Sequence, residues 1–253
     1  MSAGNRWLRR HGVEGPVGAR LVCFPHAGGT AASFAGWAGQ LPTGTELVAV
    51  QYPGRQDRIA EEPIGEMAEM ADRLAEALRP LLDRPMVFFG HSMGTGLAYE
   101  VAGRLERSDG FLTDHVFVSA RPAPHRIDGE HRHRLSDEDL VAAMRRLGGP
   151  DAEVYDHQVL LPLILPPLRA DLALLDRYRP ERLTPLRAPL TVFGGEDDDT
   201  CPIADLPAWG EATTEPVRIR LFPGGHHYLR ECENDVVRAV SVEITAAATA
   251  RNL

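Results

Sequence analysis

The stretch GHSMG at residues 90–94 decides the fold of this chain. The apolar run PMVFF (residues 85–89) stands directly before it, and a stretch with helical spacing (residues 95–105) stands directly after it. Ser92 therefore lies where a strand turns sharply into a helix, and the flanking glycines leave room for that turn. This pattern predicts a nucleophile elbow, with the serine hydroxyl above a sheet where a substrate can reach it. Because the short pattern also occurs by chance, the assignment depends on its neighbours and on partners further along the chain.

Short apolar or β-branched runs alternate with helical patterns along most of the chain. The runs occupy residues 20–24, 46–51, 86–89, 115–119, 190–193 and 217–222. Between them, apolar residues recur at helical spacing over residues 67–81 and 93–105, and a last helix is expected over residues 234–248. Alternation of this kind is typical of a mostly parallel sheet covered by helices. Together with the elbow, it predicts the α/β-hydrolase fold.

Residues 121–189 interrupt this alternation, because they carry helical signals but no convincing strand. SDED at residues 136–139 resembles a capping box and predicts a helix through Leu147, while Leu168, Leu172 and Leu175 form a second apolar face. An insertion of this length is too long for a structureless loop. We predict a helical lid over residues 121–189, between two parts of a hydrolase core at residues 1–120 and 190–253.

Composition excludes several classes of protein. The 253 residues carry a net charge of -9 without a sustained Lys/Arg run, which argues against a nucleic-acid partner. Residues 1–12 are polar, so no signal peptide is expected, and the longest apolar stretch (residues 159–168) is too short and too rich in proline to span a membrane. The three cysteines have no metal-type spacing, which suits a reducing environment. We therefore expect a cytoplasmic protein.

The two partners of a catalytic serine are expected downstream in the order acid, then histidine. The run at residues 190–193 leads into GGEDDD, and the run at residues 217–222 leads into PGGHH. A serine hydroxyl needs a base to become a nucleophile, and the base needs a carboxylate to fix its tautomer. We predict the catalytic triad Ser92, Asp198 and His226.

Each partner has neighbours that compete for its role. The turn from Gly195 to Asp198 has the spacing G-x-x-D, which returns the Asp198 carboxylate toward the sheet, while the adjacent acidic residues are interpreted as a solvated turn. Two glycines before His226 give the chain freedom to present that ring. We expect His227 to be packed or exposed to solvent.

Acyl transfer also needs donors aimed at the developing oxyanion. One donor is expected from the backbone N–H of Met93, directly after the nucleophile. The other is expected from the backbone N–H of Ala27, in the segment PHAGG (residues 25–29) that follows the first predicted parallel strand. This segment is similar to the His-Gly-Gly-type oxyanion loops, although a Gly-Gly pair also occurs in ordinary tight turns.

No cofactor or metal is expected. The chain has neither a Gly-Lys-Ser/Thr phosphate loop nor a G-x-G-x-x-G dinucleotide motif. His131 and His133 could ligate a metal, but the sequence offers no third ligand nearby and places arginines around them. The chemistry expected from the triad requires neither group.

Taken together, five motifs resemble those of the type II thioesterases of polyketide and nonribosomal peptide synthesis. The motifs are FPHAGG (24–29), QYPGR (51–55), GHSMG (90–94), GG (194–195) and PGGH (223–226), and the likeness runs from about Leu21 to the final helix. The resemblance implies an editing enzyme that hydrolyses stalled or wrong acyl groups from the phosphopantetheine arm of acyl or peptidyl carrier proteins. It also implies a helical lid in the position predicted above. Small-molecule acyl thioesters are expected as further substrates.

Three alternatives remain open from the sequence. The same residues would serve a carboxylesterase or lipase-like hydrolase, or an acyltransferase in which an alcohol or amine takes the acyl group. A hydrolase fold without activity could act as a binding module, but such a chain would be expected to lack a triad member.

Docking of an acidic carrier protein should use a locally basic surface. Residues 121–134 offer four arginines against two carboxylates: Arg121, Arg126, Arg132 and Arg134 against Asp128 and Glu130.

Overall fold

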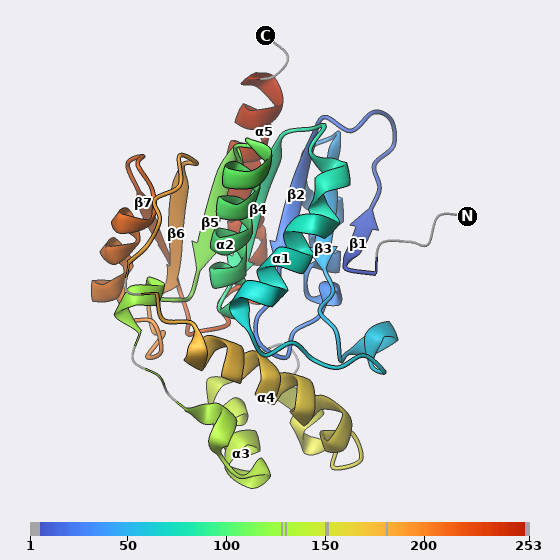
Figure 1. Ribbon diagram of the computed structural model, residues 1–253, viewed down its shortest axis with the longest axis vertical. Helices are drawn as coiled ribbons and strands as arrows, with labels where there is room; N and C mark the ends of the chain where they lie inside the picture. Colours follow the sequence, from blue (N-terminus) through green and yellow to red (C-terminus); the bar gives the residue numbers. More distant parts are fainter. Residues whose placement is uncertain (1–5, 128, 130, 150–151, 181, 251–253) are drawn as a thin grey trace.

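The computed structural model describes residues 6–127, 129, 131–149, 152–180 and 182–250. Its centre is a seven-stranded sheet with the strand order β1-β3-β2-β4-β5-β6-β7 (Figure 1). Strands β2 to β7 run parallel, and β1 pairs antiparallel with β3. The strands are β1 (Leu8–His11), β2 (Ala19–Phe24), β3 (Thr45–Val50), β4 (Met86–His91), β5 (His115–Ser119), β6 (Leu190–Gly195) and β7 (Arg218–Phe222). The predicted mostly parallel sheet is therefore confirmed.

Helices cover both faces of the sheet. The α-helices are α1 (Met67–Leu78), α2 (Met93–Asp109), α3 (Asp137–Leu147), α4 (Leu161–Arg177) and α5 (Glu233–Ala250), and the longest 3-10 helices are η1 (Ala31–Gln40) and η7 (Ile203–Ala212). In Figure 1, α1 and α2 lie in front of the sheet and α5 lies behind it. Among the described residues, no helix combines the length and the apolar composition needed to cross a bilayer.

The strand sequences divide the core into two layers. On β4, Met86 and Phe88 pack into the layer under α1 and α2, whereas Val87 and Phe89 pack into the layer with η1 and α5. This alternation follows from the two-residue period of a strand, and buried apolar residues on both faces are typical of parallel strands between helices. The same alternation recurs on β2 and β3. The elbow is therefore carried by the buried centre of the sheet.

Two details differ from the sequence prediction. Strand β1 was not predicted, because only Leu8 of its four residues is buried and an edge strand carries little hydrophobic pattern. Strands β4 and β6 also extend through polar or glycine residues at their carboxyl ends, to His91 and Gly195. The extra length brings the backbone pairing up to the edge of the sheet where the predicted site residues lie.

Helices α3 and α4 lie together beyond the carboxyl ends of the parallel strands (Figure 1). Apolar residues join them in a third core cluster: Leu140, Val141 and Met144 from α3, with Leu165, Leu168 and Leu172 from α4. Helix α3 begins as predicted, with the Ser136 side chain accepting a hydrogen bond from the Asp139 N–H. The described part of residues 121–189 contributes no strand to the sheet. The boundaries of the predicted lid stay a prediction, and Asp128 and Glu130 lie outside the described residues.

Candidate active site

Ser92 occupies a strained turn between β4 and α2. Its backbone has φ 52° and ψ -113°, a region that residues with a Cβ rarely adopt. A Cβ at Gly90 would overlap the backbone of Gly94, and a Cβ at Gly94 would overlap the carbonyl group of Phe24. The backbone N–H of Ser92 donates to the Ser119 carbonyl oxygen on β5 at 2.8 Å, which anchors the turn to the sheet. Both glycines are therefore required by close packing, as the motif predicted.

The structure brings the three predicted triad residues together. The Oγ of Ser92 lies 2.9 Å from Nε2 of His226, and Nδ1 of His226 lies 2.9 Å from Oδ2 of Asp198. The Asp198 carboxylate favours the tautomer with a proton on Nδ1, which leaves Nε2 free to accept the serine proton. Their side chains come from the ends of three different strands, β4, β6 and β7, which meet at one edge of the sheet.

Asp198 differs from the acidic residues around it. Its side chain is buried, whereas Glu196, Asp197 and Asp199 are exposed. Burial alone would raise the pKa of Asp198, but hydrogen bonds from His226 and from Thr200 outweigh burial, so the pKa is lowered. The carboxylate is therefore charged at neutral pH and can stabilise a protonated His226.

Sequence reasoning missed Thr200. Its backbone N–H and its hydroxyl both donate to Oδ1 of Asp198, at 2.9 and 2.7 Å, and its hydroxyl also lies 2.9 Å from Nδ1 of His226. These bonds fix the oxygen of Asp198 that does not face the histidine. The D-x-T spacing within residues 198–200 is a recognisable signal for such a side-chain-to-backbone turn.

Three further histidines pack around His226. The His227 ring lies 5.0 Å from the His226 ring and 5.0 Å from the His26 ring, and the His91 ring lies 5.5 Å from the His226 ring. Nδ1 of His91 is 2.8 Å from the Ser119 hydroxyl, which in turn is 2.5 Å from the Tyr228 hydroxyl. His91 and His227 are therefore packing neighbours of the predicted base.

We expect this cluster to make the stability of the fold depend on pH. Burial and the neighbouring His226 and Arg55 lower the pKa of His26 to about 4, and burial with His26 and His226 lowers the pKa of His227 to about 2. The unfolded chain binds these protons near pH 6.5, so protonation favours unfolding. Stability is full above pH 6.5 and is lost as pH falls toward the folded-state values.

We therefore expect the melting temperature to fall between pH 7 and pH 5, and the fall to be smaller in His227→Gln, which cannot gain this proton. Thermal unfolding of the two proteins across that pH range measures the effect. An equally steep fall in His227→Gln would show that the histidine cluster does not cause the acid sensitivity.

The predicted oxyanion donors flank the serine. Met93 is the first residue of α2, so its N–H is among those that have no acceptor within the helix. Ala27 lies on the loop after β2 and lines the same cavity as Ser92 and His226. In this loop the Gly29 N–H donates to the His26 carbonyl oxygen at 2.9 Å, so Ala27 lies within a tight turn. The structure therefore brings both segments to the serine, and the oxyanion role of the two N–H groups stays a prediction.

Two cavities meet at this loop. The first, about 230 Å³, is lined by Ser92 and His226 and by Leu172 and Leu175 of α4. The second, about 700 Å³, lies between the same loop and apolar residues around α4, among them Tyr155, Ile164 and Pro167. Both include His26, Ala27 and Met144 in their walls. Helices α3 and α4 therefore form part of the walls of the predicted site.

A third potential metal ligand lies beside His131 and His133, where the sequence indicated none. The structure brings Asp176 of α4 to these histidines, and the three potential ligand atoms lie within 4.8 Å of one another. No residue spacing could reveal this, because Asp176 is distant in sequence. His133 Nδ1 and the Asp176 carboxylate form a hydrogen-bonded pair.

Comparison with known proteins identifies the family. Residues 19–244 match the family model described as a thioesterase domain. The chain is 41% identical, over 96% of its length, to the probable cadicidin biosynthesis thioesterase of Streptomyces griseus, of which it spans 66%. It is 32% identical to the gramicidin S biosynthesis protein GrsT of Aneurinibacillus migulanus, with 94% of this chain and 93% of that protein covered.

A solved thioesterase structure has a similar fold. The type II thioesterase BorB from the borrelidin biosynthetic cluster superimposes with a TM-score of 0.85 at 37% identity, covering 94% of this chain and 96% of that one. The predicted α/β-hydrolase fold is thereby confirmed. A family match over most of the chain, a relative covered almost end to end and this structural likeness agree that the protein belongs to the thioesterase family.

Proposed function

We propose that this protein is a type II editing thioesterase, which hydrolyses acyl groups from the phosphopantetheine arm of a carrier protein. The observation that carries the proposal is the hydrogen-bonded chain from Ser92 through His226 to Asp198, beside a cavity that residues of α4 help to line. The relatives and the structural neighbour support the substrate class, since their names place them in the biosynthesis of cadicidin, gramicidin S and borrelidin and call the neighbour a type II thioesterase.

In the first half of the reaction, His226 Nε2 takes the proton of Ser92 as Oγ attacks the thioester carbonyl carbon. The C=O bond becomes a single bond to an oxyanion, which the N–H groups of Met93 and Ala27 stabilise. The tetrahedral intermediate collapses, the C–S bond breaks, and protonated His226 returns its proton to the leaving pantetheine sulfur. An acyl ester on Ser92 remains.

In the second half, a water molecule replaces the thiol. His226 takes a proton from the water as its oxygen attacks the acyl-ester carbonyl carbon, and the same N–H groups hold the second oxyanion. The C–Oγ bond then breaks, His226 returns the proton to Ser92, and the carboxylic acid leaves. Asp198 stabilises the imidazolium form of His226 in both halves.

The two cavities fit a thioester. Its acyl group and its pantetheine arm leave the reacting carbonyl in different directions, and the cavities meet at Ala27, where that carbonyl oxygen would be held. The apolar side chains in the mixed wall of the larger cavity, among them Ile59, Leu163 and Ile164, suit an acyl chain.

The arginines of residues 121–134 are not equally suited to testing a basic docking surface for the carrier protein. Arg126 is paired with Glu211, and Arg132 lines the cavity beside Ser92, so reversing the charge of Arg132 would disturb small substrates as well. Arg134 is exposed and does not line either cavity. It is therefore the better position for testing a role in docking.

The competing assignments are a carboxylesterase and an acyltransferase. We expect kcat/KM for an acyl-pantetheine thioester to exceed that for the matched oxygen ester by at least about tenfold, because the pantetheine arm supplies binding energy that a simple alcohol cannot. Hydrolysis of matched pairs, with product analysis in the presence of amine and alcohol acceptors, measures this. A preference for the oxygen ester, or transfer to an acceptor in place of water, would contradict the proposal.

A further inference from the structure

A buried ion pair joins α4 to the loop that carries Ala27. Asp171 of α4 is fully buried, and its carboxylate accepts hydrogen bonds from Nη1 and Nη2 of Arg55 at 2.7 and 2.9 Å. Oδ2 of the same carboxylate accepts a third bond, from the Gly28 backbone N–H at 2.8 Å. Gly28 has φ +75°, a conformation that favours glycine, and it directly follows Ala27. The carboxylate on α4 thus holds the neighbouring peptide of the predicted oxyanion donor.

The Arg55 segment holds the same loop at two other points. Nη1 of Arg55 donates to the Gly29 carbonyl oxygen at 3.2 Å, and the buried Tyr52 hydroxyl donates to the Pro25 carbonyl oxygen at 3.1 Å. The Arg55 guanidinium also lies 5.3 Å from the centre of the Tyr52 ring. The loop is therefore held on both sides of the predicted donor.

These contacts set the direction of the Ala27 N–H through one peptide plane. That N–H belongs to the same planar unit as the His26 carbonyl group, whose oxygen accepts a hydrogen bond from the Gly29 N–H. Gly29 is in turn held by Arg55 through its own carbonyl oxygen. Movement of Arg55 would therefore rotate the unit that carries the donor.

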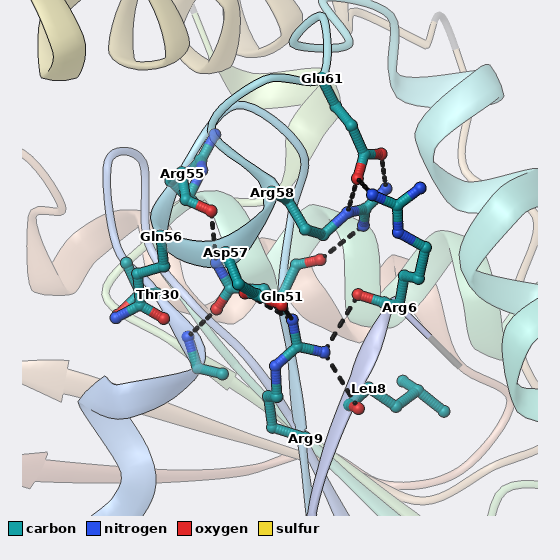
Figure 2. Close-up of polar contacts among 11 residues, drawn as sticks. Arg6, Leu8, Arg9, Thr30, Gln51, Arg55, Gln56, Asp57, Arg58 and Glu61 are labelled. Carbon is teal, nitrogen blue, oxygen red and sulfur yellow. Dashed lines mark hydrogen bonds and ion pairs between the residues drawn. The ribbon is translucent and has the colours of Figure 1, made fainter. Parts of the chain in front are cut away.

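Arg55 itself is fixed by the turn that contains it. The Gln51 side-chain amide donates to the Arg55 carbonyl oxygen at 3.3 Å, and its oxygen accepts from the Ala31 N–H at 3.0 Å. Figure 2 shows this turn and the neighbouring Arg58, whose guanidinium donates to the Gln51 carbonyl oxygen at 2.8 Å. The Gln51 bond holds the backbone at Arg55, and the bonds to Asp171 and Gly29 hold the guanidinium between α4 and the loop.

We propose that Asp171 and Arg55 are positioning residues for the oxyanion loop, so that the seating of α4 against the core is coupled to the formation of the oxyanion hole. The proposal rests on the proposed function only in that both require Ser92 to act as the nucleophile. Removing two charges from water costs about as much free energy as their attraction returns, so a buried ion pair adds little net stability. Stability alone therefore explains the pair poorly. Neither side chain forms a hydrogen bond with Ser92 or His226 in the part of the chain that the structure describes. Arg55 lines the larger cavity, but Asp171 lines neither cavity, so an effect of Asp171 must pass through Arg55 or the loop.

Asp171→Asn keeps the shape of the side chain but removes its charge. We expect kcat for p-nitrophenyl acetate to fall about 10²-fold, the effect of a displaced oxyanion donor, with KM changed less than about threefold. Affinity for a trifluoromethyl ketone, which forms a tetrahedral adduct with the serine, should fall by a similar factor. An acyl-pantetheine thioester should show the same ratio of variant to wild type.

A matched control is the buried pair of Arg20 and Glu46, with Nε and Oε2 2.8 Å apart, near the amino ends of β2 and β3 and so at the end of the sheet away from Ser92. Glu46→Gln should lower the melting temperature about as much as Asp171→Asn but leave kcat unchanged. If Asp171→Asn does not fold, Arg55→Lys offers the same test, since it keeps the charge but cannot bond both carboxylate oxygens and Gly29 together.

Unchanged kcat in the variants, or lower activity without weaker binding of the ketone, would overturn the proposal. Failure of the carrier-thioesterase function would instead appear as poor turnover of pantetheine thioesters by the wild type. That result leaves the ratio of variant to wild type on p-nitrophenyl acetate intact, so the two failures are distinguishable.

Discussion

Replacing Ser92 with alanine is expected to lower kcat by about 10⁶-fold, because no other group can form the acyl-enzyme intermediate. The Oγ of Ser92 lies 2.9 Å from Nε2 of His226 and forms no other hydrogen bond with the residues that the structure describes. Alanine keeps the Cβ, so the strain at φ 52° is unchanged and the melting temperature should shift by little. Steady-state hydrolysis of a small acyl thioester measures the loss.

Covalent labelling gives an independent readout of the same prediction. A fluorophosphonate probe reacts with an activated serine and should label the wild type but not Ser92→Ala. Circular dichroism and thermal unfolding show whether the variant keeps its fold. Equal labelling of both proteins would place the nucleophile elsewhere and remove the basis of the mechanism.

Asp198→Asn is expected to lower kcat by about 10⁴-fold, since the amide would favour the wrong tautomer of His226 and could not stabilise its protonated form. Asp197→Asn and Asp199→Asn are matched controls, because both side chains are exposed and lie on the same turn. We expect each control to retain activity within about threefold of the wild type.

Kinetic measurement of the three variants at neutral pH separates the roles. If Asp197→Asn were the variant that loses activity, the geometry of the turn after β6 would be described wrongly. A loss shared equally by all three would indicate that the turn acts through its net charge. Only a loss confined to Asp198 agrees with the 2.9 Å contact to His226.

Much of the fold could be predicted because its signals are local. Strand β4, the elbow and α2 are contiguous, so the apolar run, the two glycines and the helical spacing are all visible along the chain. Strand β1 was missed because an edge strand with one buried residue has almost no pattern. Hydrophobic periodicity thus reveals the buried elements and not the edges.

The site was predictable to the extent that its parts follow strands in a known order. Ser92, Asp198 and His226 each follow a strand, whereas the role of Asp171 depends on how α4 packs against the loop at Gly28. Packing between segments so distant in sequence has no local signal. The motif that contains Arg55 was visible in the sequence, but its partner was not.

Deacylation of a carrier protein tests the central claim most directly. A carrier protein bearing acetyl-phosphopantetheine is mixed with the wild type or with Ser92→Ala, and its intact mass is followed over time. We predict that the wild type converts the carrier to the free-thiol form and that Ser92→Ala leaves it acylated at the rate seen without enzyme. A carrier that stays acylated with the wild type, or that loses its acetyl group equally fast with Ser92→Ala, would contradict the account.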